Sequence, residues 1–259
     1  MTDHPHLRVT VDDSRQVLTV TLANAEERNA QTPSLWRALA AAGEAVGDDI
    51  RVVVLRAEGA SFSAGLHRGM LSPAGMPGEP HLVATATSAP ADTAEMIAGF
   101  QRAFRVWQEM PQVVVAAVHG HAIGAGFQLA LAADLRVLAD DAQLAMRETS
   151  LGLVPDLAGT RPLVACVGYA RALEICATGR FVGAAEATAI GLATVAVPRA
   201  ELDATTDDLV QALLEAPAGA LRELKPLLRS ATEGSAQDQL RHEREAQVRR
   251  LGALAQGQP

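Results

Sequence analysis

The chain has 259 residues, of which 49% are hydrophobic and 20% are charged, proportions typical of a globular protein. Its net charge of -8 and its aromatic content of 3% argue against a nucleic-acid or anionic-membrane surface. Lys225 is the single lysine, so Schiff-base chemistry would depend on that residue alone. The two cysteines, Cys166 and Cys176, form no Cys-x-x-Cys motif and favour free thiols over a disulfide or a zinc site.

The first half of the chain alternates strand and helix patterns. Thr32 followed by Pro33 has the cap and first-position pattern of a helix start. Residues 68–92 contain several prolines and glycines and predict a long irregular segment. In chain order, the predicted elements are a hairpin (strands 7–11 and 17–22, turn 12–15), a helix from Thr32 to about Val46, a buried strand at 51–55, the irregular segment, and a helix from about Asp92 to Glu109.

The second half begins with strands and ends in helices. The predicted elements are a buried strand at 112–118, a glycine-rich turn at 119–126, a helix at 127–133, a strand at 135–138, helices at 162–167, 170–177 and 184–190, a strand at 194–197, and helices at 201–214, 217–229 and 235–251. Strands and helices thus alternate over the first three quarters. The pattern predicts an α/β protein with an α-helical C-terminal extension.

Two turns rich in small residues have the composition of an anion site. The turn at 119–126 leads from a strand into a helix, whose free N–H groups suit an anion or a developing oxyanion. A dinucleotide loop is disfavoured because Leu129 stands where the third glycine of that motif belongs. The second turn, at 60–66, follows another buried strand. One N–H from each turn could form an oxyanion hole, although spacing does not show that they meet.

A few titratable residues are candidates for chemistry. Glu148 follows an apolar stretch and is either a catalytic base with a raised pKa or a surface carboxylate paired with Arg147. His119 and His121 would share a face of a strand, but no third ligand lies nearby, so structural roles are favoured over a metal site. His67 ends the turn at 60–66 and is interpreted as a polar residue at the rim of the site.

Taken together, these segments resemble the crotonase superfamily, the enoyl-CoA hydratase/isomerase family, over roughly residues 17–229. The resemblance implies a spiral of ββα units at residues 1–198 and a helical region at 199–259 that builds trimers, usually paired into hexamers. The markers, in order, are Glu27-Arg-Asn-Ala30, Phe62-Ser-Ala-Gly-Leu66, His119-Gly-His-Ala-Ile-Gly-Ala-Gly126, Ala133-Asp-Leu-Arg136, residues 148–152, and residues 178–192.

The resemblance also implies a substrate and a set of site residues. Family members bind acyl-CoA thioesters and hold the thioester oxygen in an oxyanion hole, with CoA as part of the substrate and no separate cofactor or metal. By position, the donors are the N–H groups of Leu66 and Ala125, and Glu148 is a catalytic carboxylate. The residues implied to bind substrate are Arg28, Ala30, Ala64, Gly65, Leu66, His67, Gly124 and Gln128.

Two departures from the family pattern bear on the reaction. Gln128 stands where the family's second catalytic carboxylate belongs, and it can orient water but cannot take its proton. Asp156 stands where several isomerases of the family carry an aspartate. The sequence therefore favours double-bond isomerisation by Glu148 with Asp156. Hydration, another thioester reaction, and a scaffold that binds acyl-CoA without turnover remain alternatives.

Assembly and location complete the expectations. Leu202, Leu209, Leu221 and further leucines give the last sixty residues more apolar surface than an isolated tail should expose, so we expect a homotrimer or homohexamer. The polar start of the chain lacks the apolar core of a signal peptide, and no apolar run is long enough to span a bilayer. With two free cysteines, these features predict a cytoplasmic protein.

Overall fold

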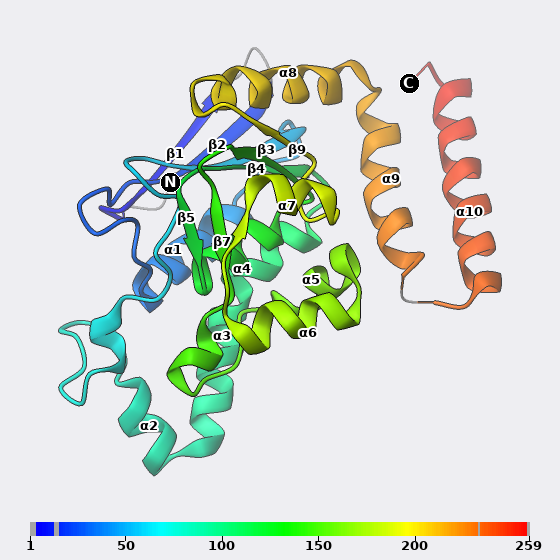
Figure 1. Cartoon of the computed structure of the whole chain (residues 1–259). Coiled ribbons are helices and arrows are strands. Elements are labelled where there is room, and N and C mark those ends of the chain that lie inside the picture. Colours follow the sequence, from blue (N-terminus) through cyan, green and yellow to red (C-terminus); the bar gives the residue numbers. More distant parts are fainter. Residues whose placement is uncertain (1–3, 13–15, 233, 258–259) are drawn as a thin grey trace.

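The computed structural model describes residues 4–12, 16–232 and 234–257 and is built around one large sheet (Figure 1). The strands of this sheet lie in the order β1-β2-β3-β4-β6-β9. β1 pairs antiparallel with β2, and the remaining neighbours pair in parallel. The bounds are β1 Leu7–Asp12, β2 Val17–Leu22, β3 Val52–Ala57, β4 Val113–Val118, β6 Leu135–Ala139 and β9 Val195–Val197. The predicted hairpin therefore forms, while residues 13–15 of its predicted turn lie outside the described residues.

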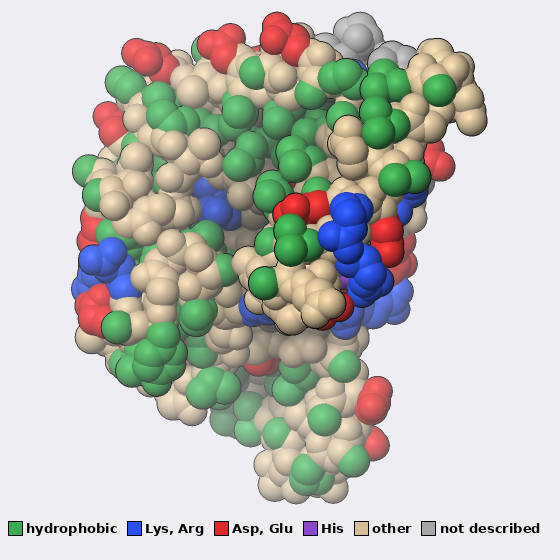
Figure 2. Space-filling model, turned by 90° about the vertical axis from the view of Figure 1, so that its right-hand side faces the viewer, with side chains coloured by type: hydrophobic (Ala, Val, Ile, Leu, Met, Phe, Trp, Pro, Cys, Tyr) green, Lys and Arg blue, Asp and Glu red, His purple; other side chains and the backbone are tan. Residues whose placement is uncertain are grey.

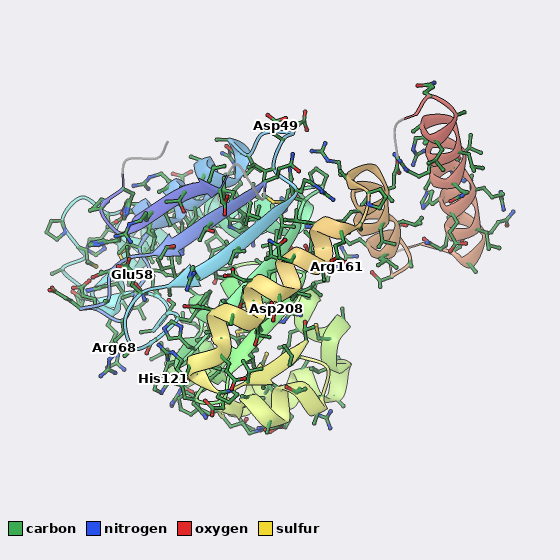
Figure 3. The ribbon with its side chains drawn as sticks, turned by 90° about the horizontal axis from the view of Figure 1, so that it is seen from above. Asp49, Glu58, Arg68, His121, Arg161 and Asp208 are labelled. Carbon is green, nitrogen blue, oxygen red and sulfur yellow. The ribbon has the colours of Figure 1, made fainter. Side chains whose placement is uncertain are left out.

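Helices cover both faces of this sheet, which explains why its central strands are continuous apolar runs. The side chains of β3 alternate, so that Val53 and Leu55 enter one core while Val52 and Val54 enter the other. The first core is closed by α1 (Pro33–Glu44), α3 (Pro90–Glu109) and α4 (Ala125–Ala132). The second is closed by α8 (Leu202–Glu215), which lies across the sheet in Figure 3. The predicted α/β class is confirmed.

A smaller sheet stands beside the first and includes a strand where we predicted only a turn. It consists of β5 (His121–Ile123), β7 (Gln143–Ala145) and β8 (Val182–Gly183). β5 forms because it also pairs with the turn after β3: the amide of Ser63 donates to the carbonyl of His121 at 2.9 Å, and the amide of Ile123 donates to the carbonyl of Ser63 at 3.0 Å. Long-range pairing therefore overrides the glycine-rich composition. The helices that follow are α5 (Thr160–Val167), α6 (Tyr169–Thr178) and α7 (Ala184–Ala189).

The segment predicted to be irregular, residues 68–92, is irregular over residues 72–81 but helical on either side of them, so the prediction is only partly right. It contains a 3-10 turn, η1 (Arg68–Leu71), and the helix α2 (Leu82–Ser88), and α3 begins at its end. No glycine or proline lies between Pro80 and Pro90, so the backbone is free to close helical turns there. Hydroxyl groups of α2 donate to carbonyls one turn earlier, at 2.8 Å from Thr85 to His81 and 2.9 Å from Ser88 to Ala84.

The last two helices stand away from the sheet. α9 (Ala218–Ser230) and α10 (Ala236–Ala255) pack side by side at one end of the molecule (Figure 1). Seen from that end, the surface carries many hydrophobic side chains (Figure 2). Leu228 of α9 and Leu251 and Leu254 of α10 are exposed. The division at residue 198 and the assembly remain predictions. Among the described residues, no helix combines the length and the apolarity needed to cross a membrane.

A buried ion pair joins α9 to the body of the protein. The ammonium group of Lys225 lies 2.8 Å from a carboxylate oxygen of Asp134 and donates to the carbonyls of Gln112 at 2.8 Å and Trp107 at 3.2 Å. The Asp134 carboxylate also accepts the amide of Val114 at 2.8 Å. Burial lowers the pKa of Lys225 and raises that of Asp134, so the pair is held by geometry against a desolvation cost.

Removing one member of this pair should weaken the fold. We expect Lys225→Met to lower the free energy of unfolding by up to about 3 kcal/mol, because it leaves the partly buried carboxylate of Asp134 without its cation. Urea unfolding measures the change. The matched control is Arg102→Met, which removes the exposed ion pair of Arg102 with Glu44 and should change stability little. Equal losses in the two variants would show that Lys225 contributes no more than a surface charge.

Candidate active site

The two turns predicted to supply oxyanion donors meet in the structure. A methyl group placed on Gly65 would lie 2.3 Å from the carbonyl oxygen of Ile123 and 3.4 Å from the amide nitrogen of Ala125. Gly65 has a φ of +86°, which glycine adopts without strain. Among the described hydrogen bonds, none uses the amide of Leu66 or of Ala125 as its donor. Ala125 is the first residue of α4, so its amide also lies at the positive end of the helix dipole.

A buried polar network holds the first turn in place. The hydroxyl of Ser63 donates to the carbonyl of Asn29 at 2.7 Å and accepts from the amide of Gly65 at 3.1 Å and from the side chain of Gln31 at 3.0 Å. The indole of Trp36 donates to Gln31 at 2.8 Å, which fixes the orientation of that amide. Sequence reasoning did not single out Gln31 or Ser63. Their polarity within apolar surroundings was the available signal, but the residues they bond were not predictable.

Glu148 lies beside the start of α4, at the head of a 3-10 turn, η2 (Glu148–Leu151). Its Oε1 would lie 3.3 Å from a methyl group placed on Gly124. Its Oε2 is buried and has no hydrogen-bond partner among the described residues. Burial, and to a smaller extent the charge of Asp156, raises the pKa of Glu148. The geometry therefore gives this carboxylate the properties of a proton acceptor and does not pair it with Arg147.

Gln128 connects Glu148 to the loop that carries Asp156. The Gln128 side chain is fully buried, and its Nε2 donates to Glu148 Oε1 at 2.8 Å. Its Oε1 accepts the amides of Leu157 at 2.9 Å and Gly159 at 3.2 Å. The structure thus brings Gln128, Glu148 and the residues after Asp156 into one hydrogen-bonded group.

The loop that carries Asp156 is also hydrogen-bonded to α3, and Asp156 itself is partly buried. Gln101 of α3 donates to its backbone carbonyl at 2.8 Å. Burial raises the pKa of the Asp156 carboxyl. The charge of Asp156 contributes to the raised pKa of Glu148, and Gln128 bonds both Glu148 and the amide of Leu157, the residue after Asp156, so the two carboxyl groups lie close enough to interact. Two acids that share such a site resist simultaneous ionisation, which suits one to accept a proton while the other donates one.

The residues implied to line a CoA cleft gather around the first turn. Arg28 is exposed and has a φ of +53°, and its carbonyl accepts the amide of Ala64 at 2.8 Å. Ala30 lies two residues after Arg28, and the amide of His67 donates to the carbonyl of Gln31, the residue after Ala30, at 2.8 Å. His67 Nδ1 accepts the amide of Gly69 at 3.1 Å, and its Nε2 lies 3.6 Å from Glu27. His67 thus faces a charged surface group.

The other two histidine candidates, His119 and His121, lie in different environments. His119 is buried and shares a hydrogen bond of 3.1 Å with the carbonyl of Gly59, and burial lowers its pKa. His121 is exposed and lies at the edge of the molecule (Figure 3). The centroid of its ring lies 5.8 Å from that of the Phe181 ring. In the part of the chain that the structure describes, no group of three His, Cys, Asp or Glu side chains is placed to hold a metal ion.

Known proteins match the chain in sequence and in structure. The sequence model of the family described as "Enoyl-CoA hydratase/isomerase" matches residues 12–253. A Thermobifida fusca YX protein assigned to the enoyl-CoA hydratases, solved in complex with CoA, is 44% identical with a TM-score of 0.90, covering 97% of this chain and 95% of that one. The enoyl-CoA hydratase from Polaromonas sp. JS666 is 31% identical with a TM-score of 0.83, covering 95% and 91%.

Among curated proteins, carnitinyl-CoA dehydratase of Escherichia coli K12 is 40% identical over 129 residues, which is 50% of this chain. The match spans 49% of that relative, so the chain corresponds to about half of its length. The family model, in contrast, matches nearly the whole chain. The overlay with the Thermobifida fusca structure also covers almost the full length of both chains. With the two oxyanion turns meeting beside Glu148, we conclude that the chain belongs to the enoyl-CoA hydratase/isomerase family, the crotonase superfamily that its sequence resembles.

Proposed function

We propose that this chain is an acyl-CoA enzyme that stabilises a thioester enolate and shifts a carbon–carbon double bond along an enoyl chain. The observation that carries the proposal is the buried Oε2 of Glu148, which has no hydrogen-bond partner among the described residues. The Glu148 side chain packs against Gly124, directly before Ala125, and the amides of Ala125 and Leu66 donate none of the described hydrogen bonds. A structural relative was solved with CoA and again with acetoacetyl-CoA, which supports a thioester as the substrate. CoA would enter as part of the substrate, with no separate cofactor.

The proposed reaction removes one proton from the substrate and returns one proton to it. The thioester oxygen of a 3-enoyl-CoA accepts the N–H groups of Leu66 and Ala125, which stabilise negative charge as it develops there. Glu148 takes a proton from C2, and the electron pair of that C–H bond forms the enolate. A proton then returns to C4 as the double bond moves to C2–C3. Asp156 supplies this proton, or Glu148 returns the one it took.

Hydration is the second candidate, because relatives such as the Polaromonas protein are named enoyl-CoA hydratases. Addition of water works best with two carboxylates on the water. Here Gln128 occupies one of those positions, and its carbonyl oxygen already accepts two backbone amides. A double-bond shift needs no water, so the hydrogen bonding of Gln128 favours isomerisation.

The proposal is tested by comparing the two substrates. Purified protein should convert 3-enoyl-CoA to 2-enoyl-CoA, followed by absorbance of the conjugated thioester, faster than it hydrates 2-enoyl-CoA. Asp156→Asn separates the two routes for the returning proton. If Asp156 supplies it, the variant should retain exchange of the C2 proton with deuterium from solvent but lose most of the double-bond shift; if Glu148 returns it, the variant should retain both. Hydration that outpaces isomerisation would overturn the preference, and no change in either substrate would overturn the enzyme assignment.

Replacing Glu148 should lower activity and raise stability near neutral pH. Glu148→Gln should lower kcat by about 10²–10⁴ with a smaller change in KM, because it removes the base and leaves the implied CoA contacts in place. The raised pKa means that the folded state binds more protons than the unfolded state above the ordinary carboxyl pKa, so stability declines as pH rises through the raised value. Near neutral pH the variant should therefore have the higher melting temperature, and the difference should vanish in acid. A less stable variant at neutral pH would contradict this account.

The approach of the two turns should be required for turnover. A side chain at Gly65 would collide with the carbonyl of Ile123, so Gly65→Ala should displace the Leu66 or Ala125 donor and lower kcat by about 10²–10³. Gly78→Ala is the matched control, because Gly78 also has a positive φ, of +79°, but a methyl group there meets nothing within 4 Å. Both variants carry similar backbone strain. Equal activity in the two would show that the contact at Gly65 does not position a donor.

A further inference from the structure

We propose that Gln128 is a positioning residue that fixes which oxygen of Glu148 is free to act as the base and ties that carboxylate to the loop carrying Asp156. This inference rests on the proposed function only in taking Glu148 as the base. The sequence placed Gln128 among the substrate-binding residues. In the structure its side chain is fully buried and forms hydrogen bonds with Glu148, Leu157 and Gly159.

The orientation of the Gln128 amide is determined by its partners. The amides of Leu157 and Gly159 are both donors, so the atom that faces them must be the carbonyl oxygen. The other end of the amide, its NH₂ group, therefore faces Glu148 at 2.8 Å. A flipped amide would place two donors against two donors and an oxygen against a carboxylate oxygen.

Packing prevents Gln128 from leaving this arrangement. A methyl group placed on Gly159 would lie 2.6 Å from Cγ and 3.0 Å from both Cβ and Oε1 of Gln128. The loop therefore closes directly onto the glutamine side chain, and a glycine is needed at position 159. Ala158, the residue before it, has a φ of +61°, which is uncommon for a residue with a side chain. The loop conformation is thus one that its contacts with α3 and α4 must maintain.

This arrangement makes the two oxygens of Glu148 different. Oε1 accepts the hydrogen bond from Gln128, while Oε2 is buried, has no partner in the described part of the chain, and is left for the substrate proton. The donated hydrogen bond also lowers the pKa of Glu148, against the larger effect of burial. The other ionisable groups near this carboxylate are Asp156 in the loop, Cys176 at the end of α6, and the adjacent Arg147.

A carboxylate at position 128 could not do the same. It would accept the two loop amides but would place a second acidic oxygen about 2.8 Å from Glu148, as judged from the present hydrogen bond. The two acids would then share a proton and titrate as a pair. Glutamine keeps such a second acid out of contact with Oε1 of Glu148, which suits abstraction of a carbon-bound proton by Oε2.

The chain provides a matched control for loop fixation. Gln101 donates to the carbonyl of Asp156 at 2.8 Å, and Gln108 donates to the carbonyl of Ala158 at 3.1 Å. Both lie on α3 and hold the same loop, but neither has a hydrogen bond to Glu148. Gln101→Met therefore loosens the loop without removing the donor to the base, whereas Gln128→Met does both.

The experiment is a pH titration of Glu148 by infrared spectroscopy in the absence of substrate. The protonated-carboxyl band of Glu148 is identified as the band that Glu148→Gln removes. We expect Gln128→Met to move its titration to higher pH and Gln101→Met to leave it in place. In the rate–pH profile with an enoyl-CoA substrate, the acid limb should shift in the same direction for Gln128→Met, with a loss of kcat of at least tenfold and a smaller change in KM.

Two results separate this inference from the proposed function. If the titration shifts but no enoyl-CoA is converted, the positioning role stands and the proposed reaction fails. If both methionine variants behave alike, or if neither moves the titration, the positioning role is overturned even when the enzyme is active. Should Gln128→Met fail to fold, Gln128→Glu decides, because a second carboxyl group within hydrogen-bond distance of Glu148 should couple to it and shift its titration, and an unshifted titration would refute the inference.

Discussion

The backbone of the turn after β3 and the backbone leading into α4 touch so closely that no side chain fits between them, and the site depends on this contact. Methyl groups placed on the glycines at the contact would lie 2.1–2.5 Å from carbonyl oxygens of the facing segment; the pairs are Gly120 with Ala60, Gly65 with Ile123, and Gly126 with Ser63. Distances this short admit only hydrogen at the α-carbon. The two free amides therefore come from separate parts of the chain, but their relative position is set by the sheet that carries both turns. Such preorganised donors need no rearrangement when negative charge develops.

The main energetic cost of the site is the burial of one carboxylate, that of Glu148. Glu148 is placed where burial disfavours its charge, and one of its oxygens has no partner among the described residues. A structural role would not require such a group, since a buried acceptor without a donor destabilises the fold. The two cores on either face of the sheet supply the apolar burial that offsets this cost. The least favourable environment in the site is thus also the one best suited to accept a proton.

Sequence reasoning predicted the elements whose evidence is local. The apolar runs of β3 and β4, the Thr32 cap of α1 and the glycine-rich turn before α4 all follow from composition and spacing. It failed for β5, whose pairing with Ser63 depends on a residue far away in the chain, and for α2, which formed in spite of the surrounding prolines. It also placed Glu148 and Gln128 as candidates but could not show the hydrogen bond between them. Side-chain contacts of this kind are set by tertiary packing, and no periodicity encodes them.

The helix that begins at Ala125 is also fixed at its other end. Arg136 is buried and donates to the carbonyls of Ala133 at 2.7 Å and Ala130 at 3.4 Å, at the C-terminal end of α4. A cation there satisfies carbonyls that the helix leaves free and interacts favourably with the negative end of its dipole. Two residues earlier, Asp134 binds Lys225 and so ties the same turn to α9. The position of the Ala125 amide therefore depends on charged groups at the far end of an eight-residue helix, and the C-terminal helices are joined to the site through that helix.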